Sequence, residues 1–196
     1  MSLNVRIRLM GLKLLARLAL MLGQREDALR QFEAMDALDP DNAYALASRA
    51  QIEDQLGQPA RAITLQRQLT RVTPGQASAW FNLGFMLEKA GDLEDALAAF
   101  REATRLSPAL DRAWYGLGLV LIRLRRFDEA VDALRKNTEL QPMSPYGWYQ
   151  LARVHVDRRN PEEAVKIIRH LKGFEPKVAA QLERETGLQA GQPASS

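Results

Sequence analysis

His155 and His170 are the two residues that could carry protons near neutral pH or bind a metal through imidazole, and the sequence contains no cysteine. Disulfides, thiolate metal sites and cysteine nucleophiles are therefore excluded. The chain also lacks a glycine-rich phosphate loop, a histidine–glutamate pair at metal-ligand spacing and a serine in a nucleophile elbow. His155 falls at a core-facing position of an expected helix, which favours a packed histidine over a catalytic one. We therefore expect a protein that is not an enzyme and that has no cofactor or metal.

Charge gives little indication of a partner, because 27 Lys and Arg residues face 24 Asp and Glu residues, for a formal net charge of +3. Nucleic-acid-binding domains usually gather basic residues on one face. Here the basic residues are interleaved with Asp and Glu along the expected helices, so no nucleic-acid partner is predicted. A hydrophobic content of 46% in 196 residues suits one globular domain with its own core. A cytoplasmic location is the expectation.

The elements that must position any binding residues are set by a repeat of 34 residues. The prolines of this repeat are Pro40, Pro74, Pro108, Pro142 and Pro176. The matching alanines are Ala28, Ala62, Ala96, Ala130 and Ala164. With 9 prolines in the chain, four further prolines in one frame would arise by chance about once in 10⁵ to 10⁶ sequences. The sequence therefore predicts a repeat architecture.

Each period is predicted to fold as two helices joined by a tight turn. Gly23, Gly57 and Gly91 occupy the turn in the first three periods, whereas Arg125 and Arg159 occupy it in the last two. Glycine adopts positive φ without steric cost. Arginine at the same place must either accept backbone strain or use another turn geometry, and both alternatives remain open. The prolines end each period, because proline cannot continue a helix.

The motif residues of each period closely resemble the tetratricopeptide repeat. In the third period they are Trp80, Leu83, Gly84, Ala96, Phe100, Ala103 and Pro108. The fourth period has Trp114, Leu117, Gly118, Ala130, Leu134 and Pro142, and the fifth has Trp148, Leu151, Ala152, Ala164, Ile168 and Pro176. The predicted repeats are 9–42, 43–76, 77–110, 111–144 and 145–178. The resemblance implies an all-α, right-handed α-α superhelical solenoid of five helical hairpins.

Small residues at two repeat positions support the same fold on physical grounds. Position twenty is always alanine, and position eight is filled by Ala16, Ala50, Gly84, Gly118 and Ala152. Small side chains let paired helices approach closely, while larger neighbours fill the space around them. One hairpin cannot bury its apolar face alone, so neighbouring hairpins must stack.

The resemblance also implies a binding surface, because the first helix of each tetratricopeptide unit lines a concave groove. The residues at the groove positions are Tyr44, Phe81, Asn82, Phe85, Lys89, Arg112, Tyr115, Arg123, Tyr146, Tyr149, Gln150 and Arg153. Aromatic rings offer large contact area and arginine pairs with carboxylates. We therefore expect a scaffold or adaptor that binds a partner protein or peptide with apolar anchors and acidic residues. The alternative is that Phe81 and Tyr115 only pack between helices.

The second period departs from the pattern at three positions. Arg49 stands where the other periods have leucine, Glu53 follows it by one helical turn, and Gln66 replaces a large apolar residue. One interpretation is an Arg49–Glu53 helix pair that reaches water. The other is a buried polar contact that needs near-complete pairing. Asn137 raises the same question in the fourth period.

The C-terminal part is predicted to contain a capping helix over 177–188 with Val178, Ala179 and Leu182 facing inward. One solenoid domain would then span residues 1–188, and residues 189–196 are predicted to be a disordered tail.

The first helix is apolar on almost every side, and it also carries Arg6, Arg8, Lys13 and Arg17. Several exposed Leu or Met side chains would favour association, since burying each one stabilises by roughly 1.5–3 kcal/mol. A homo-oligomer through Leu9, Met10, Leu14 and Met21 is therefore a possible arrangement. Membrane-surface attachment through this helix is the alternative function. A membrane partner is less favoured, because Lys13 and Arg17 interrupt the apolar run.

Overall fold

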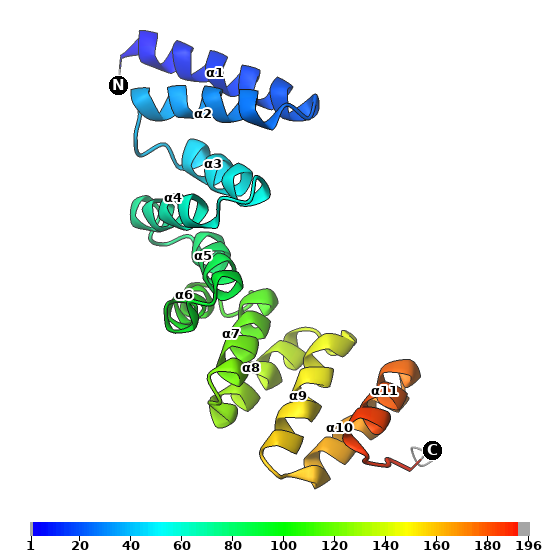
Figure 1. Cartoon of the computed structure of the whole chain (residues 1–196). Coiled ribbons are helices and arrows are strands. Elements are labelled where there is room, and N and C mark those ends of the chain that lie inside the picture. Colours follow the sequence, from blue (N-terminus) through cyan, green and yellow to red (C-terminus); the bar gives the residue numbers. More distant parts are fainter. Residues whose placement is uncertain (1, 192–196) are drawn as a thin grey trace. The chain divides into compact units, whose positions relative to one another are not determined.

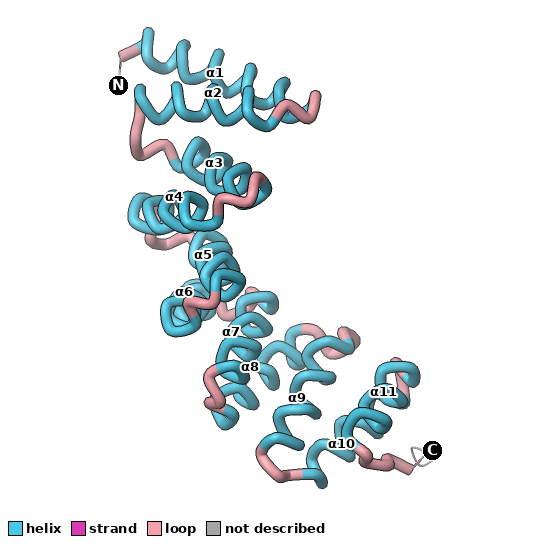
Figure 2. Tube along the Cα trace, viewed as in Figure 1, coloured by secondary structure: helices cyan, strands magenta, loops and turns pink. Residues whose placement is uncertain are grey.

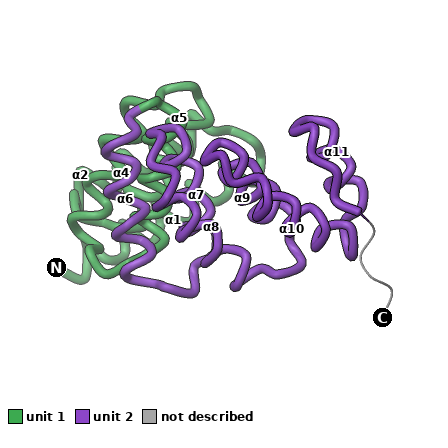
Figure 3. Tube along the Cα trace, turned by 90° about the horizontal axis from the view of Figure 1, so that it is seen from below, with its two compact units in different colours: residues 1–91 green, residues 92–196 purple. Residues whose placement is uncertain are grey.

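The computed structural model describes residues 2–191, and all the regular elements in that range are α-helices (Figure 1). Short loops and turns join them (Figure 2). The chain divides into two compact units, residues 1–91 and 92–196 (Figure 3). Unit 1 contains α1 (Leu3–Met21), α2 (Arg25–Leu38), α3 (Ala43–Gln55), α4 (Pro59–Val72) and α5 (Ala77–Ala90). Unit 2 contains α6 (Leu93–Leu106), α7 (Asp111–Arg123), α8 (Phe127–Leu140), α9 (Pro145–Asp157), α10 (Pro161–Lys172) and α11 (Pro176–Thr186).

The helix bounds follow the 34-residue frame, and the predicted all-α class is confirmed. The frames from residue 43 onward each begin at or within two residues of the first helix of a pair, whereas α1 begins at Leu3, before the predicted start at residue 9. Proline occupies the first turn of α4, α9, α10 and α11, where its missing N–H has no intrahelical partner to lose. A single solenoid domain over residues 1–188 stays a prediction.

A hydrogen bond explains why tryptophan and proline recur together. Each indole N–H donates to the carbonyl of the proline six residues earlier: Trp80 to Pro74 at 2.9 Å, Trp114 to Pro108 at 2.8 Å and Trp148 to Pro142 at 2.8 Å. The bond joins the end of one repeat to the first helix of the next. The second repeat has Leu46 at the tryptophan position, and there the Gln68 amide donates to the Pro40 carbonyl at 2.9 Å instead.

The turns within the hairpins share one backbone conformation whatever the residue. Arg125 and Arg159 have φ of 59° and 57°, in the same left-handed region as the turn glycines Gly23, Gly57 and Gly91. An L-residue with a side chain is disfavoured there by roughly 1–2 kcal/mol. Of the two alternatives for the arginine turns, the structure therefore has the strained one.

The small positions are packed as the sequence predicts. The alanines at position twenty are all fully buried. At position eight of the fourth repeat, a Cβ added to Gly118 would lie 2.7 Å from Cγ of the buried Leu134. Real Cβ atoms do not approach other carbons so closely, so α7 and α8 can only pack this tightly around a glycine.

Two buried amides replace apolar residues and each finds a backbone partner. Gln66 of α4 donates to the Ala79 carbonyl of α5 at 2.7 Å, and Asn137 of α8 donates to the Asp111 carbonyl of α7 at 3.0 Å. A buried amide is tolerated when it is hydrogen-bonded. Both residues therefore act as internal ties within their own units.

The predicted Arg49–Glu53 helix pair is wrong. Arg49 instead pairs with Asp36 of α2, with Nη1 2.7 Å from Oδ2, and Glu53 is buried. Arg49 does not pair with Glu53 one turn away, because the packing of α3 against α2 brings the carboxylate of Asp36, thirteen residues earlier, within reach of its guanidinium. The observed arrangement is a partly buried ion pair between α2 and α3, which is closer to the second interpretation, although Arg49 Nε and Asp36 Oδ1 have no hydrogen-bond partner within the described residues.

The C-terminal helix α11 packs on α10 and α9, with Ala179 and Leu182 fully buried. The chain continues to pack after α11, because Ala190 is buried and its N–H donates to the Glu183 carboxylate at 2.7 Å. Lys172 bonds to the Ala190 carbonyl and pairs with Glu183. Of the predicted disordered tail, residues 192–196 lie outside the described residues.

Candidate functional site

Four of the predicted groove residues line one pocket of about 290 Å³ in unit 2: Tyr115, Tyr146, Tyr149 and Gln150. Tyr115 comes from α7 and the other three from α9, while Val178 and Gln181 of α11 and Pro145 complete the wall. Tyr146 is 70% exposed, and Tyr115 and Tyr149 are half-buried. Three aromatic rings thus converge on a space that a side chain of a partner could fill.

A charged network lies beside this pocket. The Tyr149 hydroxyl donates to the Glu185 carboxylate of α11 at 2.5 Å, and Arg153 Nη1 lies 3.4 Å from the Tyr149 oxygen and 3.9 Å from the Glu185 carboxylate. Gln181 also donates to Glu185, at 2.8 Å. The hydrogen bonds from Tyr149 and Gln181 lower the pKa of Glu185 below its ordinary value. The hydrogen bond with Tyr149 raises the pKa of Arg153, so both ionic charges persist near neutral pH.

The other groove residues of unit 2, Arg112 and Arg123, lie at opposite ends of α7 and are exposed. Neither lines the tyrosine pocket. They therefore extend the basic character of α7 along the helix rather than adding to the pocket wall.

The five remaining groove residues belong to unit 1. Asn82, Phe85 and Lys89 of α5 are exposed, and Phe81 is half-buried. Lys89 pairs with Asp54 of α3 at 2.9 Å. Tyr44 of α3 contacts two neighbours: the Phe32 ring packs edge-on at 5.7 Å and the Lys13 ammonium lies 4.1 Å from its ring centre. These side chains remain candidates for partner contact within their own unit.

The sequence did not identify α11 as a part of the site. Val178 was expected to face inward as part of a capping helix, and a cap is not a binding wall. The repeat frame could have identified these residues, because α11 lies where the first helix of a sixth repeat would lie. Its side chains therefore meet α9 in the way that one groove-lining helix meets the next.

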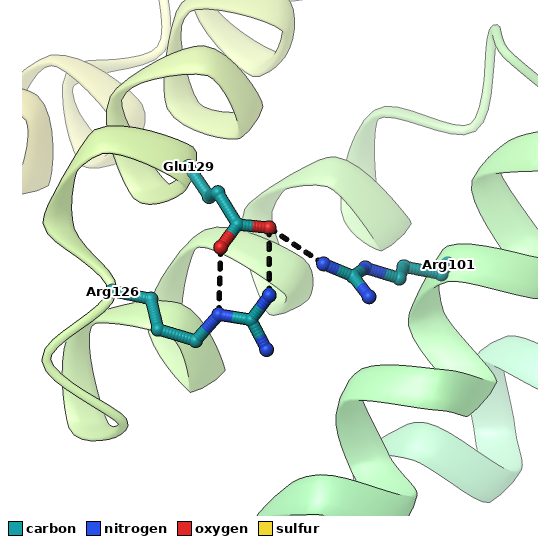
Figure 4. A network of polar contacts seen from close by, with 3 residues as sticks. All are labelled: Arg101, Arg126 and Glu129. Atoms are coloured by element: carbon teal, nitrogen blue, oxygen red, sulfur yellow. Dashed lines mark hydrogen bonds and ion pairs between the residues drawn. The ribbon is translucent and has the colours of Figure 1, made fainter.

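A second ionic network in unit 2 lies on α6 and α8 (Figure 4). Arg126 forms two hydrogen bonds to the Glu129 carboxylate, of 2.6 and 2.9 Å, and Arg101 approaches the same carboxylate at 2.6 Å. The bonds from Arg126 lower the pKa of Glu129. A carboxylate with two guanidinium partners ties α6 to the start of α8. None of these three residues lines the tyrosine pocket.

His155 packs in the core of unit 2, as predicted, and is only 2% exposed. Within residues 2–191 its Nδ1 has no hydrogen-bond partner. Burial lowers the pKa of His155 below 6.5, and the positive charges of Arg135 and Arg158 lower it further against the opposing effect of Glu163. The imidazole is therefore neutral in the folded protein at neutral pH.

Acidification is expected to destabilise unit 2 through His155. Between its lowered folded pKa and about 6.5, the unfolded chain binds the extra proton, so stability rises with pH in this window and is lost as pH falls through it. The slope is at most about 1.4 kcal/mol per pH unit for one proton. His155→Leu should flatten this part of the profile, as measured by urea unfolding at pH 7.5, 6.5 and 5.5. If the wild type and His155→Leu lose the same free energy of unfolding between pH 7.5 and 5.5, His155 is not the source of the pH dependence.

No group of three or more His, Asp or Glu side chains in residues 2–191 is arranged to hold a metal ion. Among the same residues, no helix combines the length and apolar content needed to cross a bilayer.

Solved structures with the same arrangement of helices are known. A crystal structure of MamA protein superposes with a TM-score of 0.81 at 20% identity and covers 93% of this chain and 97% of its own. MamA from Desulfovibrio magneticus RS-1 gives 0.76 at 21% identity, with 92% and 98% covered. YrrB, described as a TPR protein with an unusual peptide-binding site, gives 0.77 at 20% identity, with 86% and 88% covered. Identities this low establish the fold alone.

Comparison with curated proteins gives no match. A family model does match: the tetratricopeptide repeat model covers residues 13–75, 50–111, 87–145 and 115–176. These segments overlap, and together they run continuously from residue 13 to residue 176. The repeat frame, the helix pairs and the buried small residues agree with this match, and the chain belongs to the tetratricopeptide repeat family.

Proposed function

We propose that the protein is an interaction scaffold whose tyrosine pocket and adjacent Arg153 hold a peptide segment of a partner protein. The observation that carries the proposal is the convergence of Tyr115, Tyr146 and Tyr149 on one pocket. Tetratricopeptide repeats stack into extended surfaces that their proteins use for binding. The proposal adds to this general property a particular site and a particular chemistry of partner.

The chemistry of the site favours an apolar or aromatic anchor followed by an acidic residue. The rings offer contact area at low entropy cost, because a tyrosine has only two side-chain torsions to order. Arg153 and the Tyr149 hydroxyl already hold one carboxylate, that of Glu185. An acidic residue of the partner would be recognised by the same donors, in competition with Glu185. The five groove residues of unit 1 are proposed as further contacts.

The test is capture of partners from native lysate by immobilised wild type and by Tyr115→Ala with Tyr149→Ala. We expect the double variant to lose at least nine-tenths of each specific partner, since removing aromatic anchors typically costs 2 kcal/mol or more in binding. Met143→Ala is a matched control, because Met143 is an exposed apolar residue of the same unit outside the pocket. Tyr149→Phe separates the ring from its hydroxyl.

Thermal denaturation of the same variants decides between binding and packing. The double variant should keep its melting temperature within a few degrees if the tyrosines bind a partner. A collapse of stability would show that the rings are core, and unchanged capture would show that the partner binds elsewhere.

Self-association through α1 is a second candidate function, favoured by the unusual exposure of this helix. Its exposed large apolar residues are Leu3, Ile7, Met10, Leu14, Leu15, Leu18, Leu20 and Met21, and Leu22 follows directly. Of the four residues predicted to mediate association, Leu9 is wrong, because it is buried in the core of unit 1 together with Ala16 and Phe32. Met10, Leu14 and Met21 remain in the candidate surface.

Light scattering at several protein concentrations tests this candidate. A dimer that dissociates in Met10→Glu with Leu14→Glu would support it, and a monomer at all concentrations would exclude it. Binding to anionic vesicles that the same substitutions abolish would favour membrane-surface attachment instead. A cytoplasmic location and the absence of enzymatic activity stay predictions.

A further inference from the structure

Unit 1 contains a pocket of about 420 Å³ that shares no residue with the tyrosine pocket. Its wall is formed by Glu33 of α2, Arg49 and Glu53 of α3, and Arg61 and Thr64 of α4, with Ala60 and Leu65 as its apolar part. Four of its seven lining residues are therefore charged, and they come from three consecutive helices. Nothing in the proposed groove function uses it.

Two residues of this pocket are charged at repeat positions that are apolar in other repeats. At the position of Arg49 every other repeat has leucine, and at the position of Glu53 the first, third and fourth repeats have Ala19, Leu87 and Leu121. Both substituted side chains line the same pocket. Charged residues at core positions are destabilising unless they are fully paired, so the presence of both Arg49 and Glu53 needs an explanation.

Arg49 forms an ion pair with Asp36, and this pair is incompletely hydrogen-bonded. Its Nη1 pairs with Asp36 at 2.7 Å. Within the described residues, however, Nε of Arg49 and Oδ1 of Asp36 are buried without a hydrogen-bond partner. The arginine is therefore neutralised by Asp36 and is not available to satisfy Glu53.

Glu53 is held in the pocket by one long ion pair. The residue is only 3% exposed, and its carboxylate borders the pocket. The nearest cation is Arg61, whose Nη1 lies 3.9 Å away, beyond hydrogen-bond distance, and whose side chain is 73% exposed. An ion pair of this length with an exposed arginine contributes little, so the Glu53 carboxylate keeps most of its capacity to accept hydrogen bonds from a ligand in the pocket.

The charges favour a cation as the donor. Asp36, which lies outside the pocket lining, neutralises Arg49, so the carboxylates of Glu33 and Glu53 are balanced by the guanidinium of Arg61 alone. Thr64 uses its hydroxyl proton on the Ala60 carbonyl at 2.9 Å, which leaves its oxygen free to accept a further hydrogen bond. Leu65 and Ala60 offer an apolar wall suited to a methylene chain.

We propose that this pocket binds a primary ammonium group on an alkyl chain, held by Glu53 and Glu33 with Thr64 as a third acceptor. An ammonium has three donors and a compact charge, which matches three acceptors around an apolar wall. The alkyl-ammonium belongs either to a lysine side chain of a partner protein or to a free alkylamine. Arg61 acts as a loosely held counterion that moves aside when the ligand enters.

Calorimetric titration with three probes tests the proposal on the full chain. The probes are 1,5-diaminopentane as a free amine, Nα-acetyl-lysine methylamide as a lysine side chain, and the same lysine derivative acetylated on Nε as a neutral control. We expect the two ammonium probes to bind and the neutral probe not to bind. Tighter binding of the diamine identifies a free amine as the ligand, and tighter binding of the lysine derivative identifies a partner's lysine.

Two variants distinguish a binding site from a structural ion pair. Glu53→Gln should weaken binding of the ammonium probes at least tenfold without lowering the melting temperature, because the ion pair that it removes is the long one to the exposed Arg61. Arg61→Ala should bind as well as the wild type or better. The proposal is overturned if no ammonium probe binds, if Glu53→Gln binds equally well, or if both variants lower the melting temperature alike, as a structural Arg61–Glu53 pair would require. Since these residues lie outside the tyrosine pocket, failure here leaves the groove proposal untouched.

Discussion

Gly147→Ala is expected to lower the free energy of unfolding by about 1–3 kcal/mol, although alanine occupies the same repeat position in three other repeats. A Cβ at Gly147 of α9 would overlap the Asn137 side-chain oxygen and approach Thr138 Cγ2 to 3.1 Å. Asn137 cannot retreat without loosening its hydrogen bond to the Asp111 carbonyl. The substitution therefore forces either a steric overlap or an unsatisfied buried amide.

A double-mutant cycle with Asn137→Ala isolates this contact. Asn137→Ala alone should destabilise unit 2, because it removes a buried hydrogen bond and leaves a small void. The double variant recreates the Ala103 and Ala113 combination found at the same positions one repeat earlier. We expect its loss to be smaller than the sum of the single losses by about 1–2 kcal/mol, as measured by urea unfolding.

Gly11→Ala is the matched control, since Gly11 holds the same repeat position in α1 and no heavy atom described by the structure lies within 4 Å of a Cβ built there. Alanine at Gly11 should be neutral or stabilise by up to about 1 kcal/mol. Strict additivity of Asn137→Ala and Gly147→Ala would contradict the proposed coupling.

Leu182→Ala is expected to have the larger effect, a loss of about 2–5 kcal/mol. Leu182 is fully buried where α11 packs on the last hairpin. The same helix carries Val178 and Gln181 of the tyrosine pocket and Glu185 of the Arg153 network. Loosening α11 should therefore also speed amide hydrogen exchange in α11 and weaken partner capture.

Leu188→Ala provides the comparison, because Leu188 follows α11 and is only half-buried. Leu188→Ala should lower the free energy of unfolding, measured with urea, by well under half as much as Leu182→Ala. If Leu182→Ala lowers the free energy of unfolding no more than Leu188→Ala does, Leu182 does not anchor α11. The proposal that Leu182 holds α11 in place as part of the pocket wall would then be rejected.

The sequence predicted the helices well because their bounds depend on local chemistry. Proline, glycine and small residues act within a turn or a hairpin, and they recur in a fixed frame. Contacts between side chains far apart in sequence were not predictable in this way. Arg49 with Asp36, Gly147 with Asn137 and Tyr149 with Glu185 each depend on how two helices pack, and a single sequence shows only that each residue is unusual.

The first helix illustrates a second limit. Apolar residues occur on all sides of α1, so periodicity does not distinguish the face that packs on α2. In the structure Leu9, Ala16 and Ala19 are buried, while Leu15 and Leu18 are exposed. Ala16 and Ala19 face the neighbouring helix, where small side chains permit close approach, and Leu9 joins them in the core. Periodicity alone does not distinguish Leu9 from the exposed Leu15 and Leu18.

The tryptophan–proline hydrogen bonds have an optical consequence. The chain's three tryptophans, Trp80, Trp114 and Trp148, all donate from the first helix of the third, fourth and fifth repeats. Intrinsic indole fluorescence therefore reports on those repeats and is blind to the first two, which contain no tryptophan. Far-ultraviolet circular dichroism reports on all the helices together. Melting curves from the two signals would coincide only if the N-terminal hairpins unfold together with the rest.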